Sequence, residues 1–110
     1  MEISFKSGKL CKACSQKAAM QKAYGQLATK LSQRLMELYA ATTLAEISHL
    51  PPPRCHELEG QRAGQFAVVL DGNNRLVFTP DHDPVPRKDD GGIDLAQVTK
   101  ITILEITDYH

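Results

Sequence analysis

The distribution of sequence patterns indicates an α+β domain in which an antiparallel helix pair packs on one face of a mainly antiparallel sheet. Helical periodicity is confined to residues 9–41, and strand-like apolar runs dominate from residue 54 onward, an order typical of separate helical and sheet layers. The turn-forming residues 71–74 lie between two of these runs, as in a hairpin. We therefore predict one domain over residues 1–110, with an N-terminal strand and a sheet of three to four strands.

The first half of the chain supplies one strand and two helices. Residues 2–6 alternate polar and apolar side chains, as a short strand does, and Ser7-Gly8 ends it. Residues 9–23 form a first helical pattern, which Gly25 breaks. Residues 26–41 form a clearer amphipathic helix, with apolar side chains at spacings of three and four at Leu27, Leu31, Leu35 and Leu38. The tight break between the two helices predicts an antiparallel pair.

The middle of the chain leads from the helices to the sheet. Residues 44–48 are expected to form a helical turn, and residues 51–53 should be extended, because three consecutive prolines cannot be helical. After the predicted hairpin turn, Leu76 and Phe78 are expected to face the core. Arg75 then lies on the opposite face of the sheet, which we expect to be partly open.

The last third of the chain contains a loop and a strand. Residues 79–92 include three prolines and two glycines and are predicted to form a long loop. Residues 93–98 fit a helical turn. Residues 101–106 are apolar at positions of both parities, which is typical of an inner strand that is covered on both sides.

Charge is distributed unevenly along the chain. The formal net charge is zero, so the total gives no indication of a polyanionic partner. Before Glu37, however, Glu2 is the only acid, and the same stretch holds seven cations, which are Lys6, Lys9, Lys12, Lys17, Lys22, Lys30 and Arg34. A neutral total is therefore compatible with a basic face on the helices.

The three cysteines favour a reducing compartment. Their odd number and the lack of a signal peptide predict a cytoplasmic protein, and no apolar run is long enough to span a bilayer. Cys11 and Cys14, together with the adjacent Cys55 and His56, could supply zinc ligands. The first pair lies in a helical pattern, and adjacent residues rarely both turn toward one metal. We therefore expect half-buried thiols and predict no metal or cofactor.

Several side chains after residue 53 have chemistry suited to RNA. The candidates are Arg54, His56, Arg62, Arg75, Asp108, Tyr109 and His110. Arginine binds phosphate through two parallel hydrogen bonds, and histidine exchanges a proton near neutral pH. Metal-free cleavage of RNA needs both, because the 2′-OH must lose a proton while the phosphate gains charge and the 5′-oxygen gains a proton. Taken singly, each candidate also has an ordinary structural explanation, such as a surface ion pair.

Three segments together resemble a known family. They are Pro-x-Arg-Cys-His-Glu-Leu-Glu-Gly-x-Arg-x-Gly-Gln-Phe at 52–66, Asn-Arg-Leu-Val-Phe at 74–78 and the final Ile-x-Asp-Tyr-His at 106–110. As a set they resemble the HigB-type branch of the RelE/ParE toxin superfamily, the plasmid-maintenance proteins of bacterial type II toxin–antitoxin modules. The resemblance covers essentially the whole chain and implies the RelE-like fold.

The resemblance also implies a function and partners. It implies an mRNA interferase that inhibits translation by cutting mRNA in the ribosomal A site. It further implies neutralisation by a HigA-like antitoxin with a helix-turn-helix domain, through which operator DNA is contacted only indirectly. Arg75 matches the family's phosphate-holding strand arginine. Tyr109 and His110 match the C-terminal residues that orient or protonate RNA groups, with Asp108 beside them. His56 lies near a family histidine.

Two departures from the family pattern leave alternatives open. Relatives commonly have lysine where this chain has Glu59, and a carboxylate there would repel phosphate. The neutral total charge also differs from the usually basic toxins. There are therefore two alternatives to an active endoribonuclease. One is a ParE-like gyrase inhibitor without enzymatic activity, and the other is an inactive relative that serves as an antitoxin-binding or regulatory module.

Overall fold

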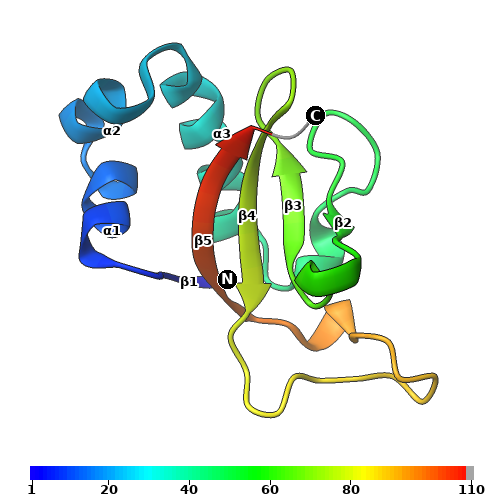
Figure 1. Ribbon diagram of the computed structural model, residues 1–110. Helices are drawn as coiled ribbons and strands as arrows, with labels where there is room; N and C mark the ends of the chain where they lie inside the picture. Colours follow the sequence, from blue (N-terminus) through cyan, green and yellow to red (C-terminus); the bar gives the residue numbers. More distant parts are fainter. Residues whose placement is uncertain (109–110) are drawn as a thin grey trace.

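The computed structural model describes residues 1–108 and arranges them as one sheet with helices on one face (Figure 1). The helices are α1 (Gly8–Ser15), α2 (Lys17–Tyr24) and α3 (Ala28–Ala40), with 3-10 turns η1 (Gly25–Leu27), η2 (Leu44–Glu46), η3 (Gly60–Arg62) and η4 (Leu95–Gln97). The strands are β1 (Glu2–Phe5), β2 (His56–Glu57), β3 (Phe66–Val69), β4 (Asn74–Pro80) and β5 (Lys100–Asp108).

The sheet confirms the predicted α+β class. Within the described residues its strand order is β1-β5-β4-β3-β2, and all neighbours are antiparallel except β1 and β5, which are parallel. The last strand, β5, lies between β1 and β4 and is therefore an inner strand, as its apolar pattern predicted. The short strand β2 completes the sheet at the edge beside β3.

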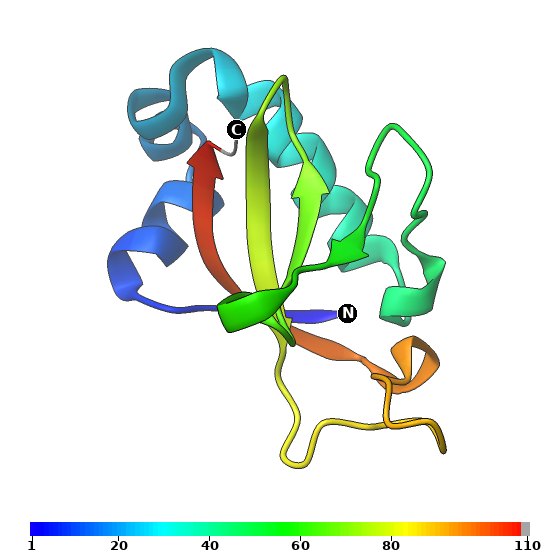
Figure 2. The same ribbon diagram turned by 45° about the vertical axis from the view of Figure 1, so that its right-hand side comes forward.

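Helix α3 supplies the helical side of the core. Leu31, Leu35 and Leu38 are buried on the side of α3 that meets the sheet, as their helical spacing predicted. The facing sheet residues in the same cluster are Phe66, Val68, Leu76, Phe78, Ile101 and Ile103. Helix α3 runs behind the sheet, whereas α1 and α2 lie to the side, beyond β5 (Figure 2). Helix α3 therefore covers the sheet. Helices α1 and α2 leave part of the outer surface of α3 uncovered.

The first helical stretch differs from the single helix predicted over residues 9–23. Gln16 has an extended backbone conformation (φ −115°, ψ 124°) and separates α1 from α2. In an unbroken helix, Cys14 and Met20 would point about 120° apart, whereas both are buried in the same core cluster. The break lets each short helix turn its own apolar side inward.

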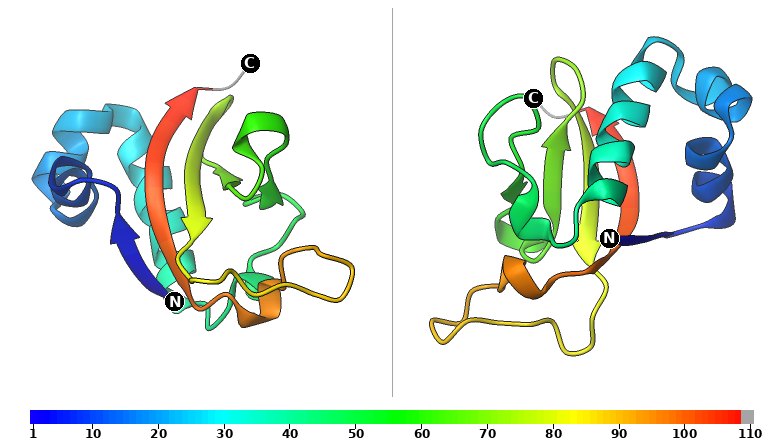
Figure 3. Two further views of the ribbon diagram at one scale, coloured as in Figure 1. Left: turned by 60° about the horizontal axis from the view of Figure 1, so that its bottom comes forward. Right: turned by 180° about the vertical axis from the view of Figure 1, so that it is seen from behind.

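Residues 58–65, which we call the flap, cover part of the face opposite α3 (Figure 3). Thr79 Oγ1 donates a hydrogen bond to the Gly64 carbonyl oxygen (3.3 Å), and Gly64 N donates to Glu57 Oε2 (3.1 Å). Ala67 and Val77 pair across β3 and β4 on this face and are fully buried. The face expected to be partly open is therefore open only beyond the flap.

A bulge in β5 decides which of its side chains face the core. Val77 pairs with Glu105 and Phe78 pairs with Ile103, so Leu104 is an extra residue on β5. Ile103 therefore faces the core with Phe78, while Glu105 shares the outer face with Val77. The two-sided apolar pattern of this strand comes partly from the bulge.

The proline segment also differs from its prediction. Residues 51–53 form a turn rather than an extended run, and the Pro51–Pro52 peptide bond is cis. The Arg54 amide donates to the Leu50 carbonyl oxygen (3.1 Å) and closes this turn. The chain thereby reverses direction before it enters β2.

The loop after β4 runs beyond one end of the sheet (Figures 1 and 2). Two backbone amides attach it to β5, since His82 Nε2 accepts hydrogen bonds from Thr99 N (3.1 Å) and Lys100 N (3.3 Å). The predicted loop and the helical turns at η2 and η4 are confirmed. None of the helices within residues 1–108 is long and apolar enough to cross a bilayer.

Candidate functional site

Arg75 lies where β4 leaves the hairpin turn, on the face of the sheet away from α3. Its neighbour Leu76 is fully buried on the α3 side, so strand alternation places Arg75 on the other face. Arg75 Nη1 donates to the carbonyl oxygens of Gly72 (2.8 Å) and Asn74 (3.1 Å). Its Nε and Nη2 make no hydrogen bond with the other residues that the structure describes. The hairpin therefore holds one edge of the guanidinium and leaves the other edge available.

Arg62 reaches the same face from the flap. Its Nη2 forms an ion pair with Glu105 Oε1 at 2.7 Å, and its Nε donates to Gln65 Oε1 at 3.0 Å. Glu105 is two residues from Thr107, the β5 partner of Arg75, a separation of about 7 Å along a strand. The two arginines thus belong to neighbouring positions on one surface, and a carboxylate partly neutralises one of them.

Glu105 is the residue of this surface that sequence reasoning missed. Its place between apolar neighbours in Ile103-Leu104-Glu105-Ile106 is a signal for an outward-facing position in an inner strand. Simple alternation from the buried Ile103 would place Glu105 in the core, however. Only the bulge at Leu104 turns it to the outer face.

His56 shares the outer face but stands two strands from β4. It pairs with Ala67, which pairs with Val77, so His56 lies about 10 Å from β4 across the sheet. Its Nδ1 is 3.0 Å from the Arg54 carbonyl oxygen. A carbonyl oxygen only accepts hydrogen bonds, so Nδ1 is the donor in this contact and Nε2 takes no part in it.

Arg54 and Asp108 are not brought together with Arg75. Arg54 is exposed in the connection before β2 and has a positive φ of 48°. Asp108 pairs with Asn74 and has the strand parity of Ile106, which packs on the core, rather than that of Arg75. Tyr109 and His110 lie outside the described residues.

Metal ligands do not cluster in the described part of the chain. Cys11 and Cys14 belong to α1, and Cys55 precedes β2 in a buried position. Within residues 1–108 no three side chains of His, Cys, Asp or Glu gather closely enough to hold a metal ion. Burial raises the pKa of the Cys55 thiol to about 12, so at neutral pH it is a protonated core residue.

Comparison with solved structures extends the fold assignment. A YoeB/ParE toxin from Agrobacterium tumefaciens matches over 100% of both chains, with a TM-score of 0.59 and 8% sequence identity. The chain has the YoeB/ParE toxin fold. YoeB of Staphylococcus aureus matches in a YoeB–YefM complex (TM-score 0.55, 14% identity) and in a YoeB dimer (0.53, 17%), each over 100% of this chain and 97% of the other. No family model and no curated protein matches the sequence.

These identities are low enough that the similarity concerns the fold alone. In this version of the YoeB/ParE toxin fold, the outer face of the sheet carries Arg75, Arg62 and His56, and Glu105 lies among them. The arrangement offers two guanidinium groups and one imidazole to an anionic ligand. The carboxylate of Glu105 competes with such a ligand for Arg62, so the ion pair must open before both arginines can bind the ligand fully.

Proposed function

We propose that this protein is the toxin of a type II toxin–antitoxin module and acts as a HigB-like, ribosome-dependent mRNA interferase. The observation that carries the proposal is the position of Arg75, which is held by its own hairpin while its Nε and Nη2 make no hydrogen bond with the residues that the structure describes. Two guanidinium nitrogens on one edge suit a bridging phosphate. The toxin fold and the motif resemblance support the same assignment.

The proposed chemistry is metal-free transesterification. The 2′-oxygen loses its proton and attacks the adjacent phosphorus, the bond to the 5′-oxygen breaks, and that oxygen takes up a proton. Arg75 stabilises the charge that develops on the phosphate, and Arg62 or Arg54 assists. His56 through Nε2, or His110, exchanges the protons, and Tyr109 positions or stacks on a base, with Asp108 beside it.

The proposed partners follow from the same assignment. A cognate HigA-like antitoxin with a helix-turn-helix domain would neutralise the protein and connect it indirectly to operator DNA. The mRNA would be met in the ribosomal A site in the cytoplasm. One of the solved structures with a similar fold is a YoeB–YefM complex. It supports the expectation that proteins of this fold bind another protein.

A second candidate function is that of an inactive relative that binds an antitoxin or regulates through it. The ion pair between Arg62 and Glu105 favours this second function, because the Glu105 carboxylate competes with phosphate for the guanidinium of Arg62. Glu59, exposed at the start of η3, adds a further negative charge beside Arg62. Both features would weaken RNA binding.

Induced expression in bacteria separates these functions. We expect growth arrest with the wild-type protein, loss of arrest with Arg75→Ala, and retained arrest with Arg87→Ala, in which an exposed arginine of the 81–99 loop is removed. Equal expression and equal melting temperatures must accompany the comparison. Arrest that persists in Arg75→Ala would contradict the proposal, and blocked supercoiling by purified gyrase would then identify the ParE-like alternative.

A further inference from the structure

Helix α1 carries two cysteines that the proposed reaction does not use. Cys11 and Cys14 are three positions apart, so they lie on one side of α1, about one turn from each other. Cys11 is exposed, whereas Cys14 is only 8% exposed and belongs to the core cluster. Thiol–disulfide exchange uses such a pair, because the exposed thiol attacks a disulfide and the shielded one then displaces the group that has been attached.

The helical spacing brings the two cysteines close to the geometry of a disulfide. In a regular helix, Cα atoms three positions apart are separated by about 5 Å, which lies inside the range of about 4.4–6.8 Å that disulfides span. The Cβ atoms are about 5–6 Å apart, whereas a disulfide holds them at about 4 Å. Closure therefore requires the turn that contains Cys14 to tighten by about 1–2 Å.

The two thiols already influence each other in the reduced protein. Burial raises the pKa of Cys14 to about 11, and the charge of Cys11 adds to this effect. Partial burial also raises the pKa of Tyr39 on α3, and the charges of both cysteines raise it further. Both sulfur atoms therefore lie on the side of α1 that approaches α3.

The end of α1 leaves room for the turn to tighten. Cys14 lies in the last turn, and Gln16 just beyond it has an extended backbone, so no continuing helix opposes a change there. Cys14 also borders a groove of about 860 Å³ between α1–α2 and α3, so packed side chains do not enclose it completely.

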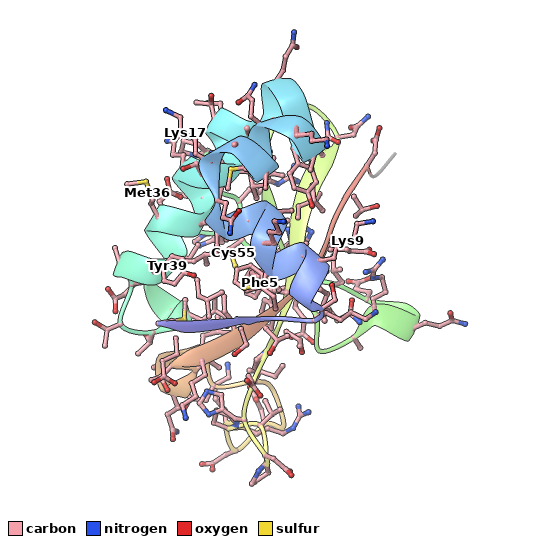
Figure 4. The ribbon with its side chains drawn as sticks, turned by 90° about the vertical axis from the view of Figure 1, so that its left-hand side faces the viewer. Phe5, Lys9, Lys17, Met36, Tyr39 and Cys55 are labelled. Carbon is pink, nitrogen blue, oxygen red and sulfur yellow. The ribbon has the colours of Figure 1, made fainter. Side chains whose placement is uncertain are left out.

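The surroundings of Cys11 suit an anionic co-reactant. Neither α1 nor α2 contains an acid, and the exposed Lys9, Lys12 and Lys17 lie near the cysteine pair in the chain. Figure 4 shows Lys9 and Lys17 on the side of the molecule where α1 and α2 face the viewer. The Ser15 hydroxyl lies 3.7 Å from Cys11 Sγ, and it is the donor when Cys11 reacts as a thiolate. Small disulfides that carry carboxylates, such as glutathione disulfide, are attracted to such a surface.

We propose that Cys11 and Cys14 form a reversible disulfide by exchange with a small anionic disulfide. Cys11 gives its proton to solvent, and its thiolate attacks one sulfur of that disulfide. The S–S bond of the small molecule breaks, and its other half leaves as a thiolate that takes up a proton. Cys14 then loses its proton and attacks the Cys11 sulfur, which releases the second half in the same way. Two protein thiols are oxidised, and one disulfide is reduced to two thiols.

Such a disulfide is compatible with a reducing compartment, where the disulfides that do form are mostly transient and catalytic or redox-sensing. Its closure changes the packing of the helices. Cys14 shares the core cluster with Met20 of α2 and Leu31 of α3, and closure draws its sulfur out of this cluster toward Cys11. We therefore expect oxidation to loosen α1 and α2 and to leave the sheet unchanged. The exchange uses neither Arg75 nor RNA, so the inference is independent of the proposed function.

Peptide mapping of the full-length protein tests the proposal. The protein is incubated with glutathione disulfide, and free thiols are then blocked in denaturant with N-ethylmaleimide. Trypsin cleaves after Lys9, Lys12 and Lys17, so peptides 10–12 and 13–17 separate in the reduced protein and stay joined if the disulfide has formed. We expect the joined peptides in the wild type, with a loss of two hydrogen atoms from the intact mass, and their separation by dithiothreitol.

Three variants assign the steps. Cys14→Ser should stop at a stable glutathione adduct on Cys11, because the second thiol is missing. Cys11→Ser should remain unmodified, because Cys14 is buried. Cys55→Ala should behave like the wild type, since Cys55 is buried beside a different cavity. A stable adduct on Cys11 of the wild type without joined peptides would overturn the proposal. A disulfide that includes Cys55, or one that links two molecules through Cys11, would also overturn it.

Hydrogen exchange tests the structural consequence. We expect amide exchange in residues 8–24 to become about tenfold faster or more on oxidation, and exchange in β4 and β5 to stay unchanged. Cys11→Ser treated in the same way is the control and should show no change. Equal exchange in the oxidised and reduced wild type would overturn the proposed effect on packing. None of these readouts depends on the growth assay with Arg75→Ala, so failure of this inference and failure of the proposed toxin function are distinguishable.

Discussion

At the scale of single residues, the capacity of the outer face of the sheet to bind an anion depends on the ion pair between Arg62 and Glu105. Their side chains are 36% and 43% exposed, so water screens the ion pair and its contribution to stability is about 1 kcal/mol or less. The same carboxylate has a larger effect on binding, because a phosphate can use Arg62 fully only after Glu105 is displaced. The pair therefore matters more for affinity than for folding.

The variant Glu105→Gln tests this balance. We expect the free energy of unfolding to change by about 1 kcal/mol or less, while affinity for a single-stranded RNA oligonucleotide rises at low salt, because a carboxylate that repels phosphate is removed from beside Arg62. Fluorescence anisotropy measures the affinity. Glu2→Gln is the matched control, since Glu2 pairs with Lys100 at the other side of the sheet. An equal rise in Glu2→Gln would show that total charge, and not Arg62, is responsible.

The buried thiols predict a pH dependence of stability. Burial, with a smaller contribution from Cys11, raises the pKa of Cys14 from 9.0 to about 11, and burial raises that of Cys55 to about 12. Unfolded thiols therefore ionise before native ones, and the unfolded state releases protons first. We expect the contribution of the two thiols to the free energy of unfolding, measured by urea denaturation, to be constant below about pH 9 and to be lost as the pH rises through about 11 and 12.

Cys11 provides the control for this prediction. It is exposed, so Cys11→Ser should keep the decline at high pH, whereas alkylation of the native protein at pH 8 should modify Cys11 well before Cys14 or Cys55. A decline that disappears in Cys11→Ser would contradict the assignment to the buried thiols.

Residue positions could be predicted from the sequence only where strand alternation was uninterrupted. Arg75 follows from Leu76 and Phe78, because the three lie on β4 and the bulge places its extra residue on β5, so alternation along β4 is uninterrupted. The contact of Arg62 with Glu105 joins residues 43 positions apart and depends on the bulge at Leu104. No local pattern encodes such a pairing.

At the scale of elements, one buried arginine connects α3 to the sheet. Arg34 is 2% exposed, its Nε donates to the Val69 carbonyl oxygen at 2.9 Å, and its Nη1 pairs with Glu37 at 3.0 Å. Val69 ends β3, so this contact fixes α3 relative to the strand that precedes the hairpin. The position of the turn that holds Arg75 therefore depends partly on Arg34.

Removal of this connection should destabilise the protein. We expect Arg34→Ala to lower the free energy of unfolding by about 2–3 kcal/mol, because it leaves the Val69 carbonyl without its charged donor and opens space beside α3. Lys30→Ala, at an exposed position of the same helix, is the control and should have little effect. Urea denaturation measures both variants. Similar losses in the two would indicate a general effect on helix α3.

The elements themselves were predictable in type and order but not in every boundary. Helix α3 and strand β4 follow from strong periodicity, and burial of their apolar sides satisfies the same pattern that predicted them. Periodicity does not predict the break at Gln16 or the two-residue strand β2, because each depends on how distant segments pack. The proline turn differs because Arg54 closes it through a backbone hydrogen bond.

At the scale of the whole molecule, a zero net charge conceals separate charged surfaces. Exposed lysines are distributed over the helices α1–α3, whereas the acids Asp81, Asp83, Asp89, Asp90 and Asp94 belong to the loop beyond the end of the sheet. The arginines of the outer face lie on the side of the sheet away from α3.

In the proposed function, Arg75 acts on mRNA within the ribosome. Primer extension on a reporter mRNA in a reconstituted translation system, with and without ribosomes, tests it most directly. Wild type and Arg87→Ala should produce codon-phased cuts that require ribosomes, and Arg75→Ala should produce none. Uncut message with the wild-type protein, or cuts that persist in a folded Arg75→Ala variant, would contradict the claim.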